Sequence, residues 1–227
     1  DIEGCFPNMP KEVIKHALRD TLQKITQEYG YDAVMIPRKK SAKCTYAQVQ
    51  YRGWKRLPFE LLLDVMDFTL DNTLIKDFDG QLWRQKSGIP MGDPHSPGFC
   101  IGTCAWMEEE WKKNLDSRTQ ENFCSTRYMD DVLTIYAKND TWDHERYLKE
   151  FTTECYFPPL RLEITSDSTF LESRLEMGSH NIRYKLKNEN YAGQEPKTWR
   201  YAHFSCYSNF EQKNTVLRSC LKKVQRA

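Results

Sequence analysis

The sequence predicts an α+β fold in which helices and antiparallel hairpins occupy different stretches of the chain. Apolar residues recur at helical spacing over 11–29, which indicates an amphipathic helix. Two stretches, 78–83 and 124–136, carry hairpin signals. Strands and helices do not alternate in the regular order that predicts a doubly wound sheet, and the sequence contains no internal repeat.

Five helices are expected, over 11–29, 59–72, 98–114, 142–155 and 209–224. The first presents one apolar face, formed by Val13, Ile14, Ala17, Leu18, Leu22 and Ile25. Pro58 opens the second helix. Ser96 is expected to cap the third helix, with Pro97 at its first helical position.

The strands are short. The opening residues 1–6 read as a strand end that runs into a turn, and the irregular, aromatic stretch 30–54 has room for a hairpin. Asp79-Gly80 supplies the positive φ of a tight turn in the hairpin at 78–83. Further strands are expected at 124–128, 132–136, 160–164, 169–175 and 182–186.

Composition limits the functional classes. The 227 residues suit one large domain or a domain with an appendage, and 39% hydrophobic residues allow a sizeable core. No apolar run approaches the ~20 residues that span a bilayer, so no membrane partner is expected. The net charge of +1 does not by itself indicate a nucleic-acid partner. Basic clusters at 38–40 and 222–226 are candidates for such a contact, or are solvated surface charges.

The eight cysteines form no C-x-x-C pair. Cys100 and Cys104 lie one helical turn apart, but no second pair has the spacing of a zinc site. Scattered cysteines favour a reduced, intracellular location, nuclear or cytoplasmic. Because the chain opens with Asp1 in a strand-like segment, we expect it to be a piece of a longer protein.

Adjacent carboxylates occur in the second hairpin signal. Asp130 and Asp131 lie between two apolar strand segments, which would hold them at the edge of a core although like charges repel. Mg²⁺ prefers such hard oxygen ligands, and two ions can stabilise the attacking and leaving oxygens of phosphoryl transfer. A two-ion site needs a third carboxylate, and Asp1, at a strand end, is the candidate.

The loop at 85–97 is the third notable feature. It holds two glycines and three prolines in the pattern Q-x-x-G-x-P-M-G-x-P-x-S-P. Glycine allows a loop backbone to approach another chain closely, and proline fixes its course. The loop is therefore either part of a binding site or a rigid lead into the following helix.

These features together resemble the reverse transcriptase family, the RNA-directed DNA polymerases. Tyr128-Met129-Asp130-Asp131 is the tetrapeptide typical of that family. The loop at 85–97 is similar to the family's template- and nucleotide-contacting loop, and Asp1-Ile2-x-x-x-Phe6 is similar to its first catalytic strand. Weaker likenesses to Penelope-like retroelement reverse transcriptases extend over 78–111, 170–172 and 184–218.

The resemblance implies roles for individual residues. Asp1, Asp130 and Asp131 would be catalytic carboxylates that hold two Mg²⁺ ions, with Mn²⁺ as an alternative and the Ile2 carbonyl assisting. Phe6 would lie beneath the sugar of the incoming nucleotide and select deoxynucleotides. The expected contacts to nucleotide, template or primer are Phe6, Gln85, Gly88, Pro90, Met91, Gly92, Tyr128 and Met129.

The resemblance also implies an architecture, the right-hand polymerase palm, in which an antiparallel sheet is backed by the helices at 11–29 and 98–114. Residues 1–176 would form the palm, with an inserted finger-side segment near 30–58. Residues 177–227 would form the palm–thumb connection and the start of the thumb, and most of the fingers would be missing. The implied partners are an RNA or DNA template with its primer, and dNTPs; the oligomeric state stays open.

Two alternatives remain. An RNA-dependent RNA polymerase shares the palm and the paired aspartates, although the loop at 85–97 and the Tyr-Met-Asp-Asp sequence favour a reverse transcriptase. A domesticated nucleic-acid-binding relative without catalysis is the second alternative, against which the three aspartates argue.

Overall fold

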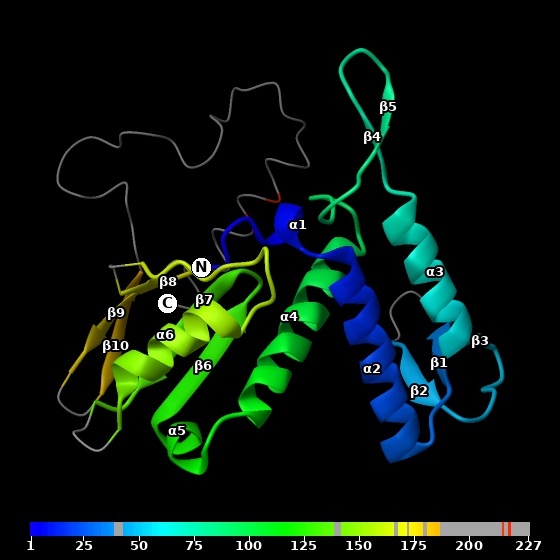
Figure 1. The fold of residues 1–227 in the computed structure, drawn as a ribbon. Coiled ribbons are helices and arrows are strands. Elements are labelled where there is room, and N and C mark those ends of the chain that lie inside the picture. The colour runs from blue at the N-terminus through cyan, green and yellow to red at the C-terminus, as the bar shows by residue number, and fades with distance from the viewer. Residues whose placement is uncertain are drawn as a thin grey trace. The chain divides into compact units, whose positions relative to one another are not determined.

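The computed structural model describes residues 1–38, 43–138, 142–165, 168–171, 173–178 and 181–186, together with Thr215 and Arg218 (Figure 1). The chain divides into two compact units, Asp1–Ser166 and Asp167–Ala227. Of the expected last helix at 209–224, only Thr215 and Arg218 are described, and both are helical. Most of the two basic clusters and Glu172 lie outside the described residues. The predicted division of the chain at 176 stays a prediction.

The first unit contains the helices that the structure describes. They are α1 (Cys5–Asn8), α2 (Lys11–Tyr29), α3 (Phe59–Asp71), α4 (Ser96–Lys113), α5 (Ser117–Asn122) and α6 (His144–Glu154). Helix α2 packs against both α3 and α4, and the three lie side by side in Figure 1. The bounds of α2 match the prediction, and α3, α4 and α6 begin or end within two residues of theirs.

The strands of the first unit form three separate antiparallel sheets. In the first, β1 (Ala33–Pro37) lies between β2 (Thr45–Ala47) and β3 (Trp54–Pro58). Two hairpins form the others, β4 (Leu74–Lys76) with β5 (Leu82–Arg84) and β6 (Phe123–Tyr128) with β7 (Asp131–Tyr136). The hairpins predicted near 78–83 and 124–136 are therefore confirmed. The stretch 30–54 holds the β1–β2 pair, and β3 adds a third strand directly after it.

The second unit contributes one antiparallel sheet in the order β10-β9-β8. Its strands are β8 (Thr169–Phe170), β9 (Ser173–Met177) and β10 (Ile182–Leu186). The single strand expected at 169–175 is in fact two, because Leu171 adopts a positive φ of 56° between them. The first unit contains helices and antiparallel sheets and the second contributes an antiparallel sheet, so the expected mixture of helix and antiparallel sheet is confirmed.

The core of the first unit lies where α1, α2, α3, α4 and α6 meet. Its buried residues are Ile2, Cys5, Met9, Ile14, Met66, Leu70, Ile89, Cys100, Cys104, Met107, Phe151, Cys155, Tyr156 and Leu160. Helix α4 turns small residues such as Cys100 and Cys104 inward, which allows α1 to approach it closely. Burial of apolar surface at about 25 cal/mol per Å² is the main stabilising contribution here.

The structure differs from the prediction at three places. The opening residues do form a strand end and a turn, as expected, but a short helix that was not expected begins at Cys5. Residues 160–164 form no strand and contribute only a single bridge, between Leu162 and Ile2. Ser96 does not cap α4, because the cap residue is His95 and Ser96 is already helical.

Among the described residues, no helix is both long enough and apolar enough to cross a bilayer.

Candidate active site

The β6–β7 hairpin carries the paired aspartates at its tip. Tyr128 pairs with Asp131, so Met129 and Asp130 are the two residues of the turn. Met129 has a φ of 58°, a conformation that costs a residue with a side chain about 1–2 kcal/mol. A turn of this kind normally has glycine at that position. Backbone strain of this sort concentrates at functional sites.

The segment with Asp1 lies directly against this turn. The Ile2 amide donates to the Asp130 carbonyl at 2.9 Å. On its other side the segment pairs antiparallel with residues 161–163, since the Glu163 amide donates to the Asp1 carbonyl at 2.8 Å and Ile2 bridges Leu162. The structure thus brings Asp1, Asp130 and Asp131 to one edge of the fold, although Asp1 and Asp130 are far apart in sequence.

Arg127 restrains the turn at Met129 and Asp130, a role that the sequence did not predict. Its guanidinium, 7% exposed, pairs with Glu108 of α4 and donates to the Met129 carbonyl at 2.9 Å. The Tyr156 hydroxyl also donates to Glu108, at 2.6 Å. Burial alone would lower the pKa of Arg127, but the hydrogen bond and charge of Glu108 outweigh it and raise that pKa. The tip of the hairpin is therefore tied to α4.

The donor set at this edge suits a hard divalent cation. Asp1 is exposed, and Asp130 and Asp131 are half-buried, so their carboxylates can reach solvent and ions. Their oxygens do not form a group of three ligand atoms within 4.8 Å of one another; among the described residues only three cysteines do. Rotation of exposed side chains is inexpensive, and oxygen ligands of Mg²⁺ lie at about 2.0–2.1 Å from the ion. The residues therefore fit Mg²⁺, once the carboxylates converge on it.

The loop at 85–97 is joined to α1 by its backbone. The Ile89 amide donates to the Phe6 carbonyl at 2.8 Å. Gly88 is buried, with a φ of 71°, and a Cβ atom there would lie 2.3 Å from the Pro7 carbonyl oxygen. Only glycine allows this approach. Gly88 thus has a structural role in addition to the nucleotide contact that was predicted for it.

Lys11 holds the start of this loop, a second role that the sequence analysis missed. Its ammonium donates to the Gln85 carbonyl at 2.6 Å and to the Leu70 carbonyl at 2.5 Å. The Gln85 side-chain nitrogen donates to the Ser87 carbonyl, while its Oε1 atom is buried without a partner among the described residues. A buried acceptor left unpaired costs about 1–3 kcal/mol, so Gln85 is poised to accept a hydrogen bond.

An open hollow of about 640 Å³ lies beside this part of the loop. Its walls include Lys11, Arg84, Gln85, Lys86 and Gly88, together with neighbouring residues of α1 and α2. Three of these side chains are basic, which suits an anionic ligand, and two acids of the same hollow offset them in part. The hollow therefore adjoins the loop for which a nucleic-acid contact was predicted.

The other predicted contact residues are mostly open to solvent. Met91 is 77% exposed and Tyr128 is 63% exposed, so both are available to a ligand. Gly92 has a φ of 97° in open space. Pro90 is half-buried, and Phe6 is half-buried against the core. A nucleotide sugar would contact the part of Phe6 that remains accessible.

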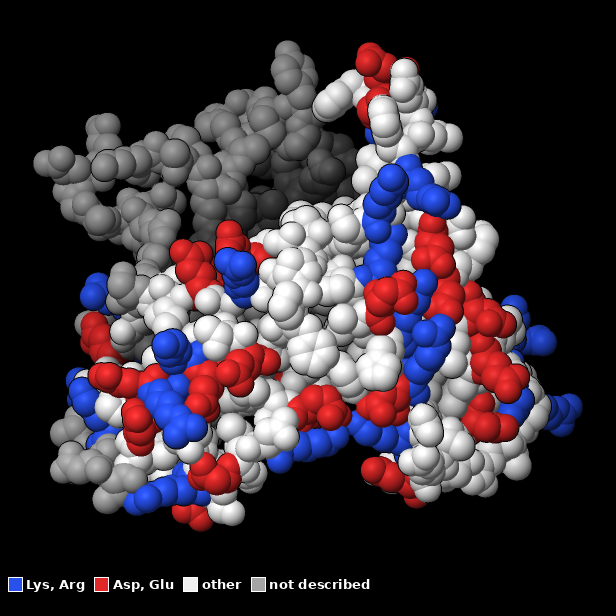
Figure 2. All heavy atoms as spheres, in the orientation of Figure 1, with Lys and Arg blue, Asp and Glu red and all other residues white. Residues whose placement is uncertain are grey.

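Charge is mixed over the face of the molecule seen in Figure 2. Lys and Arg side chains there are interspersed with Asp and Glu, and an uncharged area lies between them. This face therefore has no broad basic surface, and a nucleic acid that binds there would contact small local groups of Lys and Arg.

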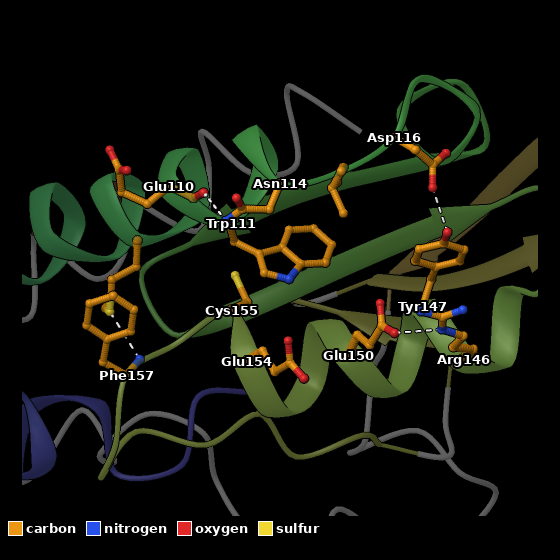
Figure 3. Close-up of a pocket in the computed structure, with 12 residues that line it drawn as sticks. Glu110, Trp111, Asn114, Asp116, Arg146, Tyr147, Glu150, Glu154, Cys155 and Phe157 are labelled. Atoms are coloured by element: carbon orange, nitrogen blue, oxygen red, sulfur yellow. Dashed lines mark hydrogen bonds and ion pairs between the residues drawn. The ribbon is translucent and has the colours of Figure 1, made fainter.

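A second hollow, of about 470 Å³, lies along α4 and α6 and contains no predicted site residue (Figure 3). Its polar side chains mainly pair with each other. Asp116 caps α5 through the Thr119 amide and accepts from the Tyr147 hydroxyl at 2.6 Å, while Arg146 pairs with Glu150 at 2.7 Å. The bond between Tyr147 and Asp116 connects α6 to the start of α5, while the Arg146–Glu150 pair lies within α6, so these contacts have a structural role.

No protein-family profile and no curated protein sequence matches the chain. Among solved structures, it is similar to a telomerase from Candida tropicalis in complex with a TWJ fragment of telomeric RNA. The TM-score is 0.56 and the identity 14%, over 96% of this chain. The chain spans 32% of the length of that telomerase. At this identity the likeness shows the fold alone: the chain has the fold of part of a telomerase.

Proposed function

We propose that the chain is the palm-centred part of a reverse transcriptase that extends a primer with dNTPs on a nucleic-acid template. The hydrogen bond from the Ile2 amide to the Asp130 carbonyl carries the proposal, because it brings the Asp1 segment against the strained turn that bears the other two carboxylates. The sequence motifs agree with this arrangement, as does the fold shared with telomerase, a reverse transcriptase relative.

The three carboxylates would hold two Mg²⁺ ions, which supply charge stabilisation for the attacking and leaving oxygens when bound. The protein's part is to position these groups. The hydrogen bond to Ile2 sets the place of Asp1, and Arg127 restrains the turn through the Met129 carbonyl. Positioned, preorganised charges of this kind account for much of the catalysis of phosphoryl transfer.

Phe6 and the loop at 85–97 would select and orient the substrate. The Phe6 carbonyl accepts a hydrogen bond from the Ile89 amide, which places Phe6 next to the loop. A flat ring against the sugar excludes a 2′-hydroxyl by clash and by leaving that hydroxyl unpaired. Gln85, with its unpartnered acceptor, would receive a hydrogen bond from the template or nucleotide.

Primer extension tests the proposal. The full-length protein is assayed on RNA and DNA templates with dNTPs or rNTPs, in Mg²⁺ and in Mn²⁺. We expect extension with dNTPs on RNA, and we expect Phe6→Val to admit rNTPs while it retains extension with dNTPs. A wild-type preference for rNTPs would favour the RNA polymerase alternative. Nucleic-acid binding without any extension would favour the non-catalytic alternative.

A further inference from the structure

Three buried cysteines come together beneath the candidate active site, and we call them the thiol cluster: Cys5, Cys100 and Cys104. Their sulfur atoms all lie within 4.8 Å of one another, and the Cys5 and Cys100 sulfurs are 3.2 Å apart. Their exposed fractions are 2%, 0% and 0%. Cys100 and Cys104 are one turn apart on α4, and Cys5 is the first residue of α1.

The contact between Cys5 and Cys100 is not a disulfide. A disulfide has an S–S distance of about 2.05 Å, whereas 3.2 Å corresponds to a hydrogen bond between sulfurs. Hydrogen bonds from Cys104 and Cys5, with the charge of Arg127, lower the pKa of Cys100 to about 4. The hydrogen bond with Cys100 raises the pKa of Cys5. The three thiols therefore form one hydrogen-bonded group, in which the thiolate form is favoured most at Cys100.

We propose that the thiol cluster is a buried site for one thiophilic metal ion, held by three cysteine sulfurs. Sulfurs bound at about 2.3 Å to one ion lie about 3.7–4.0 Å apart, so the observed spacing needs only small side-chain shifts. Each cysteine of the cluster that is protonated in the free protein releases its proton on binding, since metals bind thiolates.

The donor set favours a three-coordinate ion. Thiolates select soft ions such as Cu(I) and Zn(II), but structural Zn(II) sites are almost always four-coordinate. Within the part of the chain that the structure describes, no histidine, carboxylate or fourth cysteine joins the group. Cu(I), which accepts three sulfurs, is therefore the ion that the site fits best.

An ion in the thiol cluster would link two elements of the candidate active site. Cys5 is adjacent to Phe6 on α1, and the Phe6 carbonyl binds the loop at 85–97 through Ile89. A metal bond from α1 to α4 would hold this assembly against the core. The site itself does not depend on the proposed polymerase activity, and metal binding tests it separately.

The test is a titration of the reduced protein with Cu(I), without oxygen and against a colorimetric Cu(I) chelator, with Zn(II) titrated in parallel. We expect one Cu(I) per chain, sulfur-to-copper absorption in the near ultraviolet and a higher melting temperature. Cys5→Ser and Cys104→Ser should each weaken Cu(I) at least 100-fold. Cys155→Ser is the matched control, because Cys155 is equally buried and lies outside the cluster, and it should bind as the wild type does.

Circular dichroism establishes that each variant is folded. If a cluster variant does not fold, a measurement on the wild type replaces that variant. Bound Cu(I) should then protect Cys5, Cys100 and Cys104 from an alkylating reagent, and mass spectrometry identifies the protected cysteines. Equal Cu(I) affinity in the cluster variants and in Cys155→Ser would overturn the proposal, as would a Cys5–Cys100 disulfide in protein isolated without reductant. Tighter binding of Zn(II) than of Cu(I) would overturn the three-coordinate assignment.

Discussion

The two hairpins of the first unit have the same two-stranded plan, but different parts of the molecule stabilise them. In β4–β5 every strand residue is exposed, and the turn is closed by Asp77, which accepts from the Gln81 amide at 2.8 Å and the Trp83 indole at 2.7 Å. In β6–β7 the turn is held by contacts with other elements: Arg127 of β6 pairs with Glu108 of α4, and the Ile2 amide donates to the Asp130 carbonyl. The first hairpin is specified locally and the second by tertiary contacts.

The difference extends to the turn residues themselves. The β4–β5 turn places Gly80 at a φ of 84°, where glycine is unstrained. The β6–β7 turn places Met129 at a φ of 58°, where a side chain is strained. Tertiary contacts that maintain a strained turn next to two carboxylates are what a positioned catalytic site requires, whereas a structural turn needs only local bonds.

The largest expected effect is on the rate of primer extension, which should depend on the β6–β7 turn and not on the β4–β5 turn. Asp130→Asn removes a proposed metal ligand, and we expect primer extension in Mg²⁺ to fall at least about 10³-fold while the protein stays folded. Asp79→Asn changes the same residue type in the β4–β5 turn and should leave the rate unchanged. Single-turnover extension measures both. A near wild-type rate for Asp130→Asn would contradict the assignment.

The second effect concerns the loop that is joined to α1. In Gly88→Ala the new methyl group meets the Pro7 carbonyl at 2.3 Å, so we expect a loss of at least about 3 kcal/mol of unfolding free energy. Gly92→Ala also introduces a side chain at positive φ, but in open space, and should lose only about 1–2 kcal/mol. Chemical denaturation compares them. Equal losses would mean that the close approach to Pro7 is unimportant.

The third effect tests the tertiary anchor of β6–β7. Arg127→Ala leaves the Glu108 carboxylate and the Met129 carbonyl without their donor, and should cost about 2–3 kcal/mol. Lys76→Ala removes an exposed cation from β4 and should change stability by less than about 0.5 kcal/mol. Urea denaturation provides both values. If the two variants were equally stable, the anchor would have no energetic role.

The smallest effect concerns backbone strain in the two turns. Gly80→Ala should cost about 1 kcal/mol, because alanine tolerates the positive φ poorly. Met129→Gly should change stability by less than about 1 kcal/mol, since relief of strain offsets the greater flexibility of glycine in the unfolded chain. Thermal denaturation measures both. A loss above about 2 kcal/mol for Met129→Gly would show that Met129 is unstrained and stabilises by packing.

The same contrast explains which features the sequence predicted. The helix at 11–29 and the two hairpins were predicted correctly because their apolar periodicity and turn residues are local. Helix α5 was missed because it has only six residues and its main signal is the capping residue Asp116. The strand expected at 160–164 reduces to one bridge because its pairing depends on the distant Ile2.

Site residues followed the same rule. The motif with Asp130 and Asp131 was visible in the sequence, and the structure brings Asp1 beside it. Arg127 was not identified, because an arginine that precedes a turn has no pattern that reveals its partner on α4. The thiol cluster was not identified because Cys5 and Cys100 are 95 residues apart and fit no known ligand spacing. Sequence patterns identify motifs of neighbouring residues, whereas contacts between residues far apart in the sequence are seen only in the structure.

Cation binding at the tip of β6–β7 tests the central claim most directly. Electron paramagnetic resonance measures Mn²⁺ bound to the protein with a chain-terminated primer, its template and the next dNTP. We predict two bound ions in the wild type and in Asp79→Asn, and at least tenfold weaker binding in Asp130→Asn. The same Mn²⁺ affinity in all three proteins would contradict a metal site formed by Asp1, Asp130 and Asp131.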